Sequence, residues 1–201
     1  GHFSADGGAD CGMHGTAIAG LIAARPCQPG DFTGIAPSAD TYAIRVFGPD
    51  GANQADVAAA IDMLVDVQHV DLINLSLTGT VASELERDAI EYAWEHGVLC
   101  LCAAGNDAAA IMYPAQYPQA VSVAALGAQG WGPPSSVAAQ MAPAAPDQIG
   151  RDQYYLAPFS SRGPGLDCCA PGIGIVSTAP EAAGFPCAWS EDSGTSLATP
   201  L

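Results

Sequence analysis

Short apolar runs alternate with amphipathic stretches along the chain. The apolar runs predict strands at 41–46, 71–76, 98–104 and 120–124, and the unbroken run at 98–104 indicates a strand buried on both faces. Between the first three runs, apolar residues recur at helical spacing. Strands that alternate with helices are typical of a parallel sheet. We therefore expect an α/β fold in which helices flank a central, mostly parallel sheet.

Two of the expected helices carry N-terminal signals. Asn53 is a favourable N-cap for the first helix. Ser83 and Glu86 have the spacing of a capping box, in which each side chain accepts a hydrogen bond from the other residue's backbone N–H. Leu85 is expected on the buried face of this second helix, and Gly97 is placed to end it.

The pattern changes between residues 127 and 156. This stretch is rich in Gly, Pro, Ala, Ser and Gln and shows no clear period. We expect a surface insertion at 127–156, which is tolerated because the entropy of closing a loop grows slowly with its length. No repeat or charge run divides the rest, so residues 1–201 are expected to form a single domain.

Composition indicates a folded protein. Apolar residues make up 49% of the 201 residues and charged residues 13%, the opposite of the balance in disordered chains. No apolar run approaches the roughly 20 residues that span a bilayer, so no transmembrane segment is expected. The net charge of −16 disfavours binding to nucleic acid. It fits adaptation to salt, a preference for cationic peptides, or the composition of the source genome.

The seven cysteines fall into two groups. Four lie in apolar, strand-like sequence and are expected to be free, buried thiols: Cys100, Cys102, Cys168 and Cys169. Three lie in Pro- and Gly-rich sequence and are disulfide candidates: Cys11, Cys27 and Cys187. No metal site is expected, because no Cys-x-x-Cys pair occurs.

Three short motifs carry candidate chemistry. His14 begins a helical run, where the positive end of the helix dipole disfavours protonation and so suits a general base. Asn106 follows the apolar strand at 98–104, and its amide can donate to an oxyanion without adding charge. Ser196 precedes Pro200 in a run that predicts a helix N-terminus, which favours a nucleophile that develops negative charge nearby. Each residue alone could instead be a cap or a turn former.

The order of these motifs resembles the subtilase family of serine peptidases. His-Gly-Thr at 14–16, Ala-Ala-Gly-Asn at 103–106 and Gly-Thr-Ser-x-Ala-Thr-Pro at 194–200 follow the order of that family. Segments at 34–37 and 159–163 are also similar to it. The resemblance implies a three-layer, subtilisin-like fold and a serine endopeptidase that hydrolyses protein or peptide substrates through an acyl-enzyme intermediate.

The resemblance also implies roles for individual residues. Ser196 is then the nucleophile, His14 the general base, and Asn106 with the Ser196 N–H the oxyanion hole. A bound peptide is expected to lie as an added antiparallel strand between two segments of the chain. The implied substrate-binding residues are Ser76, Leu77, Thr78, Gly79, Ala104, Gly105 and Met112.

The orienting aspartate of the triad is not found. In the family it lies about thirty residues before the His, so Asp6 and Asp10 are too close to His14 for this role. The chain also stops at Leu201, one turn into the helix expected to carry Ser196. We therefore expect a peptidase domain truncated at both ends, with the triad Asp outside the chain; the alternative is that the protein lacks it.

Two pocket positions differ from the common pattern of the family. Thr78 stands where the family often has Gly, and Met112 stands where small residues are frequent. Both side chains would narrow the main specificity pocket. We expect cleavage after small or medium apolar residues rather than after bulky aromatic ones.

Two other functions were weighed against the peptidase. A catalytically silent subtilase-fold domain would bind peptides without reacting at Ser196. An α/β-hydrolase is disfavoured, because it needs a Gly-x-Ser-x-Gly elbow and a His after the Ser. No cofactor is needed for the chemistry; the family often binds calcium, but the carboxylates here are too scattered to nominate metal ligands.

The compartment is inferred from cysteines and from the resemblance. The cysteines in loop sequence, and a similarity of residues 10–45 to secreted actinobacterial subtilases of the mycosin type, favour an extracellular or cell-envelope location. The expected buried thiols would also suit the cytoplasm.

Overall fold

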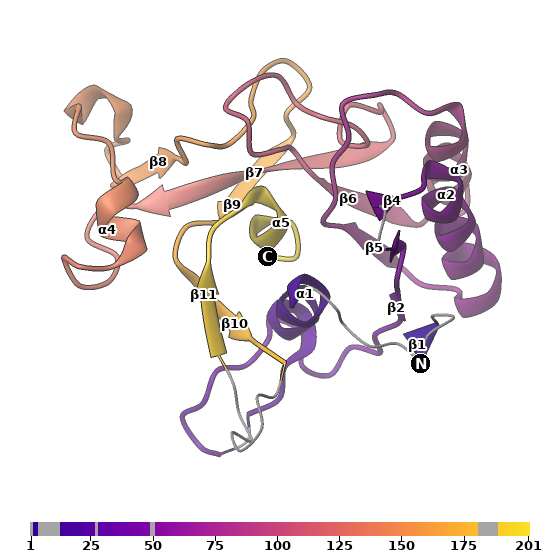
Figure 1. Cartoon of the computed structure of the whole chain (residues 1–201), viewed down its shortest axis with the longest axis horizontal. Helices are drawn as coiled ribbons and strands as arrows, with labels where there is room; N and C mark the ends of the chain where they lie inside the picture. Colours follow the sequence, from indigo (N-terminus) through magenta and orange to yellow (C-terminus); the bar gives the residue numbers. More distant parts are fainter. Residues whose placement is uncertain (1, 4–12, 27, 49–50, 181–188) are drawn as a thin grey trace.

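The computed structural model describes residues 2–3, 13–26, 28–48, 51–180 and 189–201. Figure 1 shows its elements, which are, in chain order, β1 (His2–Phe3), α1 (His14–Ala23), β2 (Ala43–Ile44), β3 (Phe47–Gly48), β4 (Gly51–Ala52), α2 (Gln54–Met63), the π-helical turn η1 (Leu64–Gln68), β5 (Leu72–Leu75), α3 (Glu84–Glu95), β6 (Leu99–Ala103), β7 (Ala120–Ala128), α4 (Val137–Met141), the 3₁₀ turn η2 (Pro146–Gln148), β8 (Tyr154–Leu156), β9 (Cys168–Pro171), β10 (Ile175–Thr178), β11 (Trp189–Asp192) and α5 (Thr195–Ala198).

The central sheet is mostly parallel, as predicted. Its strands run in the order β5-β6-β7-β8, and β9 also pairs with β7. All of these pairs are parallel except that between β7 and β8. Three two-stranded pairs complete the described strands: β1 with β2, β3 with β4, and β10 with β11. The expected α/β fold is confirmed.

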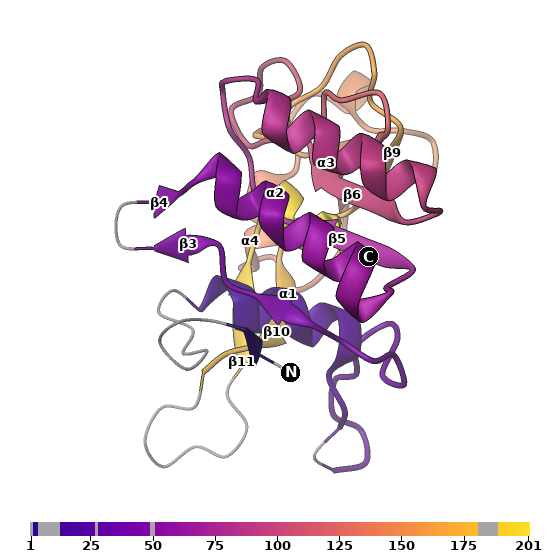
Figure 2. The same cartoon turned by 90° about the vertical axis from the view of Figure 1, so that its right-hand side faces the viewer.

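Helices α2 and α3 cover one face of the sheet. Figure 2 shows them lying together in front of β5 and β6. Their apolar residues, Val57 and Ile61 from α2 and Ile90 from α3, form one core cluster with Ile73 of β5 and Cys102 of β6. This cluster is the largest of the three in the described residues, so the helical spacing identified the main core correctly.

Helices α1 and α5 pack together away from α2 and α3 (Figure 1). Ile18 and Leu21 of α1 join Ile175 of β10 and Leu197 of α5 in a separate apolar cluster. This cluster packs α1, which begins at His14, against the short helix α5, which begins at Thr195. None of the helices in the described part of the chain is long and apolar enough to cross a bilayer.

The predicted helix caps are partly confirmed. The Asn53 side chain accepts a hydrogen bond from Ala55 N at 2.9 Å, as expected of an N-cap. Ser83 Oγ accepts one from Glu86 N, but the reciprocal half of the capping box does not form. The Ser83 backbone N–H donates instead to the hydroxyl of Tyr117, at 2.7 Å. The Glu86 carboxylate is thereby released from the cap.

Other local predictions need correction. The strand expected at 41–46 is reduced to β2, because the chain turns at once into the β3–β4 hairpin. Leu85, expected in the core, has 57% of its surface exposed because it lies on the outer side of α3. Strand β6 is not evenly buried, since Leu99 is exposed and Leu101 half-buried. Gly97 follows α3 with φ at 79°, in agreement with its predicted role.

The stretch 127–156 is more ordered than a surface loop. It contains the end of β7, helix α4 and strand β8, which pairs antiparallel with β7. Tyr155 of β8 is buried, and its hydroxyl donates to Ala138 O at 3.0 Å. Sequence periodicity missed these elements because each is only three to five residues long.

The described cysteines are free thiols, but they do not share one environment. Cys100 and Cys102 are buried, as expected, whereas Cys168 and Cys169 are exposed on β9. The prediction was wrong for the latter pair, which lies on a strand that pairs on one side only, with β7, among the described residues. The disulfide candidates Cys11, Cys27 and Cys187 lie outside the described residues.

Candidate active site

The candidate residues gather where β5 and β6 end. Ser76 directly follows β5, and 104–106 directly follow β6. These two strands are parallel neighbours, paired from Leu72 with Leu99 to Leu75 with Cys102. Their carboxyl ends therefore meet at one edge of the sheet, which is where ligands bind in open parallel sheets.

Ser196 lies in the first turn of α5 and is bonded to Ser76. Ser76 Oγ donates to the Ser196 carbonyl oxygen at 2.7 Å, and Ser196 Oγ donates to the Ser76 carbonyl oxygen at 3.3 Å. Gly194 caps this helix in an extended conformation. The Ser196 N–H has no recorded acceptor among the described residues, as is usual at the start of a helix.

The Asn106 amide is oriented by Thr195. Asn106 Oδ1 accepts hydrogen bonds from the Thr195 backbone N at 2.9 Å and from Thr195 Oγ1 at 3.0 Å. A backbone N–H can only donate, so this contact fixes which end of the amide is the oxygen. Asn106 Nδ2 then points away from Thr195 and is available as an uncharged donor near Ser196.

Thr195 was not singled out from the sequence, although it stands beside Ser196 in the same motif. It is fully buried, and its Oγ1 also accepts a hydrogen bond from Gly105 N at 3.2 Å. One hydroxyl thus joins the loop after β6 to the helix that carries Ser196. The sequence did offer a sign of this role, because a hydroxyl buried beside the candidate nucleophile needs hydrogen-bond partners of its own.

Asn74 was also missed. It lies in β5, and its Nδ2 donates to Ser76 Oγ at 2.9 Å. Ser76 Oγ in turn donates to Ser196 O, so a chain of two hydrogen bonds runs from β5 to α5. Asn74 Oδ1 is buried without a hydrogen-bond partner.

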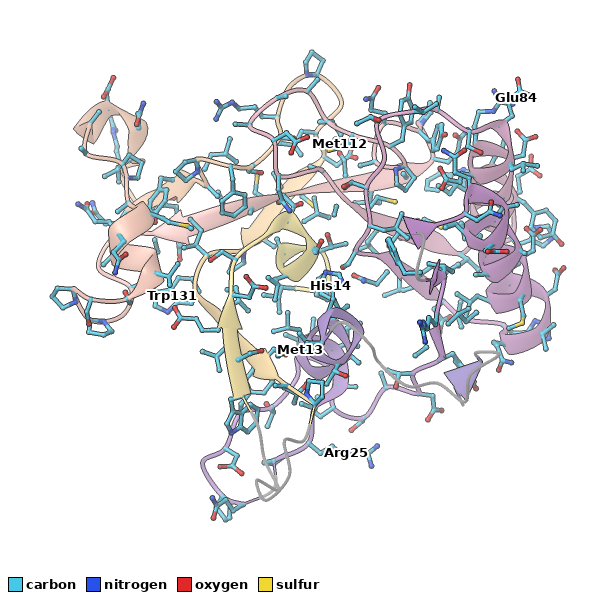
Figure 3. All side chains as sticks on the ribbon, viewed as in Figure 1. Met13, His14, Arg25, Glu84, Met112 and Trp131 are labelled. Atoms are coloured by element: carbon cyan, nitrogen blue, oxygen red, sulfur yellow. The ribbon has the colours of Figure 1, made fainter. Side chains whose placement is uncertain are left out.

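His14 is the first residue of α1. Figure 3 shows it on the side of α1 that faces α5. Two hydroxyls of β10 fix the helix, because Ser177 Oγ donates to Ala17 O at 2.6 Å and Thr178 Oγ1 donates to Thr16 O at 2.8 Å. These two hydrogen bonds from β10 fix the first turns of α1, the helix that packs against α5.

The hydrogen bonds of a complete triad are not formed within the described residues. The exposed His14 imidazole has no recorded bond there to Ser196 Oγ or to a carboxylate. Asp6 and Asp10 lie outside the described residues. The structure places His14 at the start of α1, which packs against the helix α5 that carries Ser196, while the Ser196 hydroxyl donates to Ser76 O.

Two of the expected substrate-binding residues have unpaired backbones. Among the described residues, no backbone partner is recorded for Leu77 or Thr78. Gly79 differs, because its N–H donates to Tyr113 O at 2.7 Å and its carbonyl accepts from Tyr113 N at 3.0 Å. The backbone groups available to an added strand are therefore those of Leu77 and Thr78. The available segment ends at Gly79, whose backbone groups are already paired.

The backbone groups of Ala104 and Gly105 already have hydrogen-bond partners within the protein. Ala104 N donates to Val123 O, and its carbonyl accepts from Met112 N. Gly105 N donates to Thr195 Oγ1, and its carbonyl accepts from Ser161 N. This segment forms a wall of the site. Its two N–H groups are occupied, but each carbonyl oxygen can still accept a second hydrogen bond, so the expected pairing of Ala104 and Gly105 with a peptide stays a prediction.

Met112, which is labelled in Figure 3, lies between β6 and β7 and packs against that wall. A Cβ placed on Gly105 would lie 2.6 Å from Met112 Sδ and 2.8 Å from Ser161 Oγ. Gly105 has φ at 113°, a conformation that side chains rarely adopt. Glycine is therefore required here, and the Met112 thioether occupies the space beside it.

The described residues contain no cluster of metal-binding side chains. Across the described ranges, no three His, Cys, Asp or Glu side chains are grouped as a metal ion requires. Calcium also binds backbone and amide oxygens, so the calcium that the resemblance allows stays a prediction, and no step of the chemistry below uses a metal.

The whole arrangement matches known proteins. The family model described as the subtilase family matches residues 3–201. Subtilisin BL of Lederbergia lenta is 34% identical over 189 residues, which cover 93% of this chain and 59% of that protein. Subtilisin E of Bacillus subtilis (strain 168) is 31% identical over 197 residues, 95% of this chain and 44% of that protein.

Solved structures agree with this match. The S41 psychrophilic protease superposes with a TM-score of 0.75 at 32% identity, over 95% of this chain and 60% of its own. Sphericase gives a TM-score of 0.75 at 29% identity, over 95% of this chain and 61% of its own. The chain spans about half the length of the curated relatives it matches.

Proposed function

The chain belongs to the subtilase family, and from this premise we propose that it carries the nucleophile, base and oxyanion donor of a serine endopeptidase. Ser196 Oγ attacks the scissile carbonyl, and its proton passes to the His14 imidazole. His14 then gives that proton to the leaving amine, which departs and leaves an acyl group on Ser196. Water, deprotonated by His14, attacks the acyl group, and His14 returns this proton to Ser196 Oγ as the acid is released.

The oxyanion of each tetrahedral intermediate needs two donors. Asn106 Nδ2 and the Ser196 N–H are proposed for this role, because the first is aimed by Thr195 and the second has no recorded acceptor. Both are uncharged and already oriented, so they need no reorganisation when charge develops.

One observation carries the proposal. The Ser196 hydroxyl is anchored at the point where β5 gives way to the unpaired backbone of Leu77 and Thr78. A peptide that pairs with this edge is delivered to the nucleophile with its carbonyl beside Asn106. Rotation about χ1 of Ser196 releases its oxygen from Ser76 O and turns it toward His14 and the substrate.

The orienting carboxylate is proposed to be an Asp about thirty residues before His14, as the resemblance implies. Its effect is to hold the imidazole in the correct tautomer and to stabilise the imidazolium. Loss of such an Asp lowers kcat by roughly 10⁴.

The proposed specificity follows from Met112. Its thioether fills space against Gly105, on the wall that the residue before the cleaved bond would face. Small or medium apolar side chains therefore fit better than aromatic ones. Substrates are proposed to be proteins or peptides.

The location is proposed to be extracellular or in the cell envelope. It rests on the resemblance to subtilisins and on the cysteines in loop sequence at positions outside the described residues. The similarity of residues 10–45 to mycosin-type subtilases stays a prediction. Detection of the protein in culture medium or envelope fractions, against a cytoplasmic marker, tests the location.

A fluorophosphonate probe tests the activity itself. In the full-length protein we expect covalent labelling of Ser196, located by peptide mass mapping, and hydrolysis of casein. Ser196→Ala should abolish labelling, and His14→Ala should slow hydrolysis by at least about 10³. A wild-type protein that binds peptides but is neither labelled nor hydrolytic would establish the silent peptide-binding domain instead.

A further inference from the structure

A second pocket lies beyond the open edge, on the side away from Ser196. It has a volume of about 550 Å³. Its walls come from the β3–β4 hairpin, the start of α2 and the loop after β5, with Phe47, Val57, Leu77 and Val81 among them. Gln54 Nε2 donates to Val81 O at 3.1 Å and ties two of these walls together.

Glu86 of α3 forms part of this pocket and is the one charged residue among the described residues that line it. Only 5% of its surface is exposed. The capping-box partner expected for its carboxylate, the Ser83 N–H, donates to Tyr117 instead. The described residues include no recorded donor to the Glu86 carboxylate.

The carboxylate also has no neutralising cation. The titratable groups that face it are the Cys102 thiol and the Tyr117 hydroxyl, and burial raises the pKa of both, so they stay neutral. The neighbouring Arg87 points outward and pairs with Asp88 at 2.8 Å. A buried, unpaired carboxylate is costly unless a partner arrives from outside.

Glu86 lines the pocket, and its carboxylate oxygens are not fully enclosed. The fully enclosed polar side-chain atoms without a partner in the described residues are Asn74 Oδ1 and Ser161 Oγ, and the oxygens of Glu86 are not among them. A ligand in the pocket can therefore reach Glu86 directly, whereas bulk solvent reaches it only to a small extent.

The direction of the edge determines which part of a substrate reaches the pocket. The chain runs from Ser76, beside Ser196, through Leu77 and Thr78 toward the pocket. An antiparallel peptide runs the opposite way, so the residues beside the pocket precede the cleaved bond. Three residues of strand extend about 10 Å, which places the pocket near the third to fifth residue before that bond.

We propose that Glu86 makes this pocket a binding site for a basic side chain, lysine or arginine, in the third to fifth position before the cleaved bond. The inference rests on the proposed peptidase function. The apolar walls accommodate the methylene stem, and Glu86 receives the charged end. This would pair a carboxylate that the fold leaves without a counter-ion.

The test uses the full-length protein and a set of internally quenched peptides. Each peptide carries arginine or citrulline, its neutral isostere, at one of the second to fifth positions before the cleaved bond. Titration with the fluorophosphonate probe gives the concentration of competent sites, so that kcat/KM is expressed per folded active site. The same set is measured with Glu86→Gln and with Glu84→Gln.

Glu84 provides a matched control on the same helix. Its side chain is exposed at the N-terminal end of α3 (Figure 3) and does not line the pocket. We expect arginine to exceed citrulline by about tenfold in kcat/KM at one position from the third to the fifth. Glu86→Gln should reduce that ratio to near one, and Glu84→Gln should leave it unchanged.

Each other outcome contradicts the inference in a recognisable way. A preference for arginine at every position, reduced equally by both variants, would indicate the general acidic field. Equal cleavage of arginine and citrulline peptides by a labelled enzyme would overturn the inference and leave the peptidase intact. An unlabelled, inactive wild type would overturn the proposed function and this inference together.

Discussion

Ser76 and Ser196 exchange two hydrogen bonds that run in opposite directions. Ser76 Oγ donates to Ser196 O at 2.7 Å, and Ser196 Oγ donates to Ser76 O at 3.3 Å. The first bond fixes the backbone of the proposed nucleophile, while the second holds its hydroxyl in a resting position. The end of β5 therefore sets both where the nucleophile sits and where its oxygen points before substrate arrives.

Replacement of Ser76 tests this relationship. Ser76→Ala removes the donor to Ser196 O, and we expect the free energy of unfolding to fall by about 1–3 kcal/mol. We also expect a lower kcat, because Ser196 loses its fixed backbone. Chemical denaturation and steady-state kinetics measure the two effects. Ser38→Ala, at an exposed serine, serves as the control and should change neither.

Thr195 is expected to act as a positioning residue through Asn106. Thr195→Val keeps the shape but removes the hydroxyl that bonds Asn106 Oδ1 and Gly105 N. We expect kcat to fall by about tenfold to hundredfold with KM little changed, less than the 10²–10³ known for loss of the oxyanion asparagine in a subtilisin. Thr195→Ser should restore most of the rate. A loss of rate in Thr195→Ser as large as that in Thr195→Val would contradict the prediction, because Ser keeps the hydroxyl that Val removes.

Met112 is expected to limit the residue before the cleaved bond. Met112→Gly removes the thioether that packs on Gly105 and enlarges the site. We expect the kcat/KM ratio for phenylalanine over alanine substrates to rise by at least about tenfold, in line with the effect of a few methylene groups in a pocket. Peptide-library profiling of both proteins measures the shift. A wild type that already favours phenylalanine or tyrosine would contradict the prediction.

Glu86 is expected to make stability depend on pH. Burial raises the pKa of its carboxyl, so the folded protein holds this proton more tightly than the unfolded chain does. Its contribution to the free energy of unfolding is therefore full below the ordinary glutamate pKa of about 4.3 and is lost as pH rises through the raised pKa. The groups facing it, Cys102 and Tyr117, stay neutral across this range.

Removal of that carboxylate should stabilise the protein at neutral pH. In a Ser196→Ala background, which prevents self-digestion, Glu86→Gln is expected to raise Tm by about 2–4 °C at pH 7.5, the change that about 1 kcal/mol produces. The difference should shrink toward pH 4. Glu84→Gln should not raise Tm, because its exposed carboxylate is favourable at the start of α3. A larger gain at pH 4 than at pH 7.5 would refute the argument.

The thiols are expected to react in a fixed order. Cys168 and Cys169 are exposed, whereas Cys100 is buried and its pKa is raised to about 12. Iodoacetamide at pH 8 should therefore modify β9 first and spare Cys100 and Cys102 until denaturant is added. Peptide mass mapping over time follows each site. Early modification of Cys102 in the native protein would show that β6 is more accessible than the structure indicates.

Sequence patterns predicted the parts of this protein that depend on neighbours in the chain. Helical spacing located α2 and α3, and Asn53 caps α2 with its own side chain. The motifs at His14, Asn106 and Ser196 fall at the start of α1, after β6 and in α5, as the resemblance implied. Local periodicity and motif spacing can predict such elements, because each depends on residues close together in the sequence.

The errors come from contacts between distant residues. The capping box of Ser83 and Glu86 fails because Tyr117, 34 residues later, takes the Ser83 N–H. The backbone of Gly79, expected to bind substrate, pairs with that of Tyr113, 34 residues later, which the sequence did not indicate. Neither competitor can be recognised from spacing within one helix or one strand, since both arrive through tertiary packing. The same displacement left Glu86 at the wall of the second pocket, so the failed capping box marks the residue for which we propose a role in substrate binding.

The sequence separation between contacting residues also determines when, during synthesis of the protein, the site can form. Ser76 and Ser196 are 120 residues apart, and the hydroxyl of Thr178 reaches back 162 residues to fix α1 at Thr16. Chains emerge from the ribosome N-terminus first, and contacts between such remote residues close late. The nascent polypeptide therefore carries the proposed base long before it has the proposed nucleophile, and we expect a ribosome-bound chain to be unable to cut its neighbours.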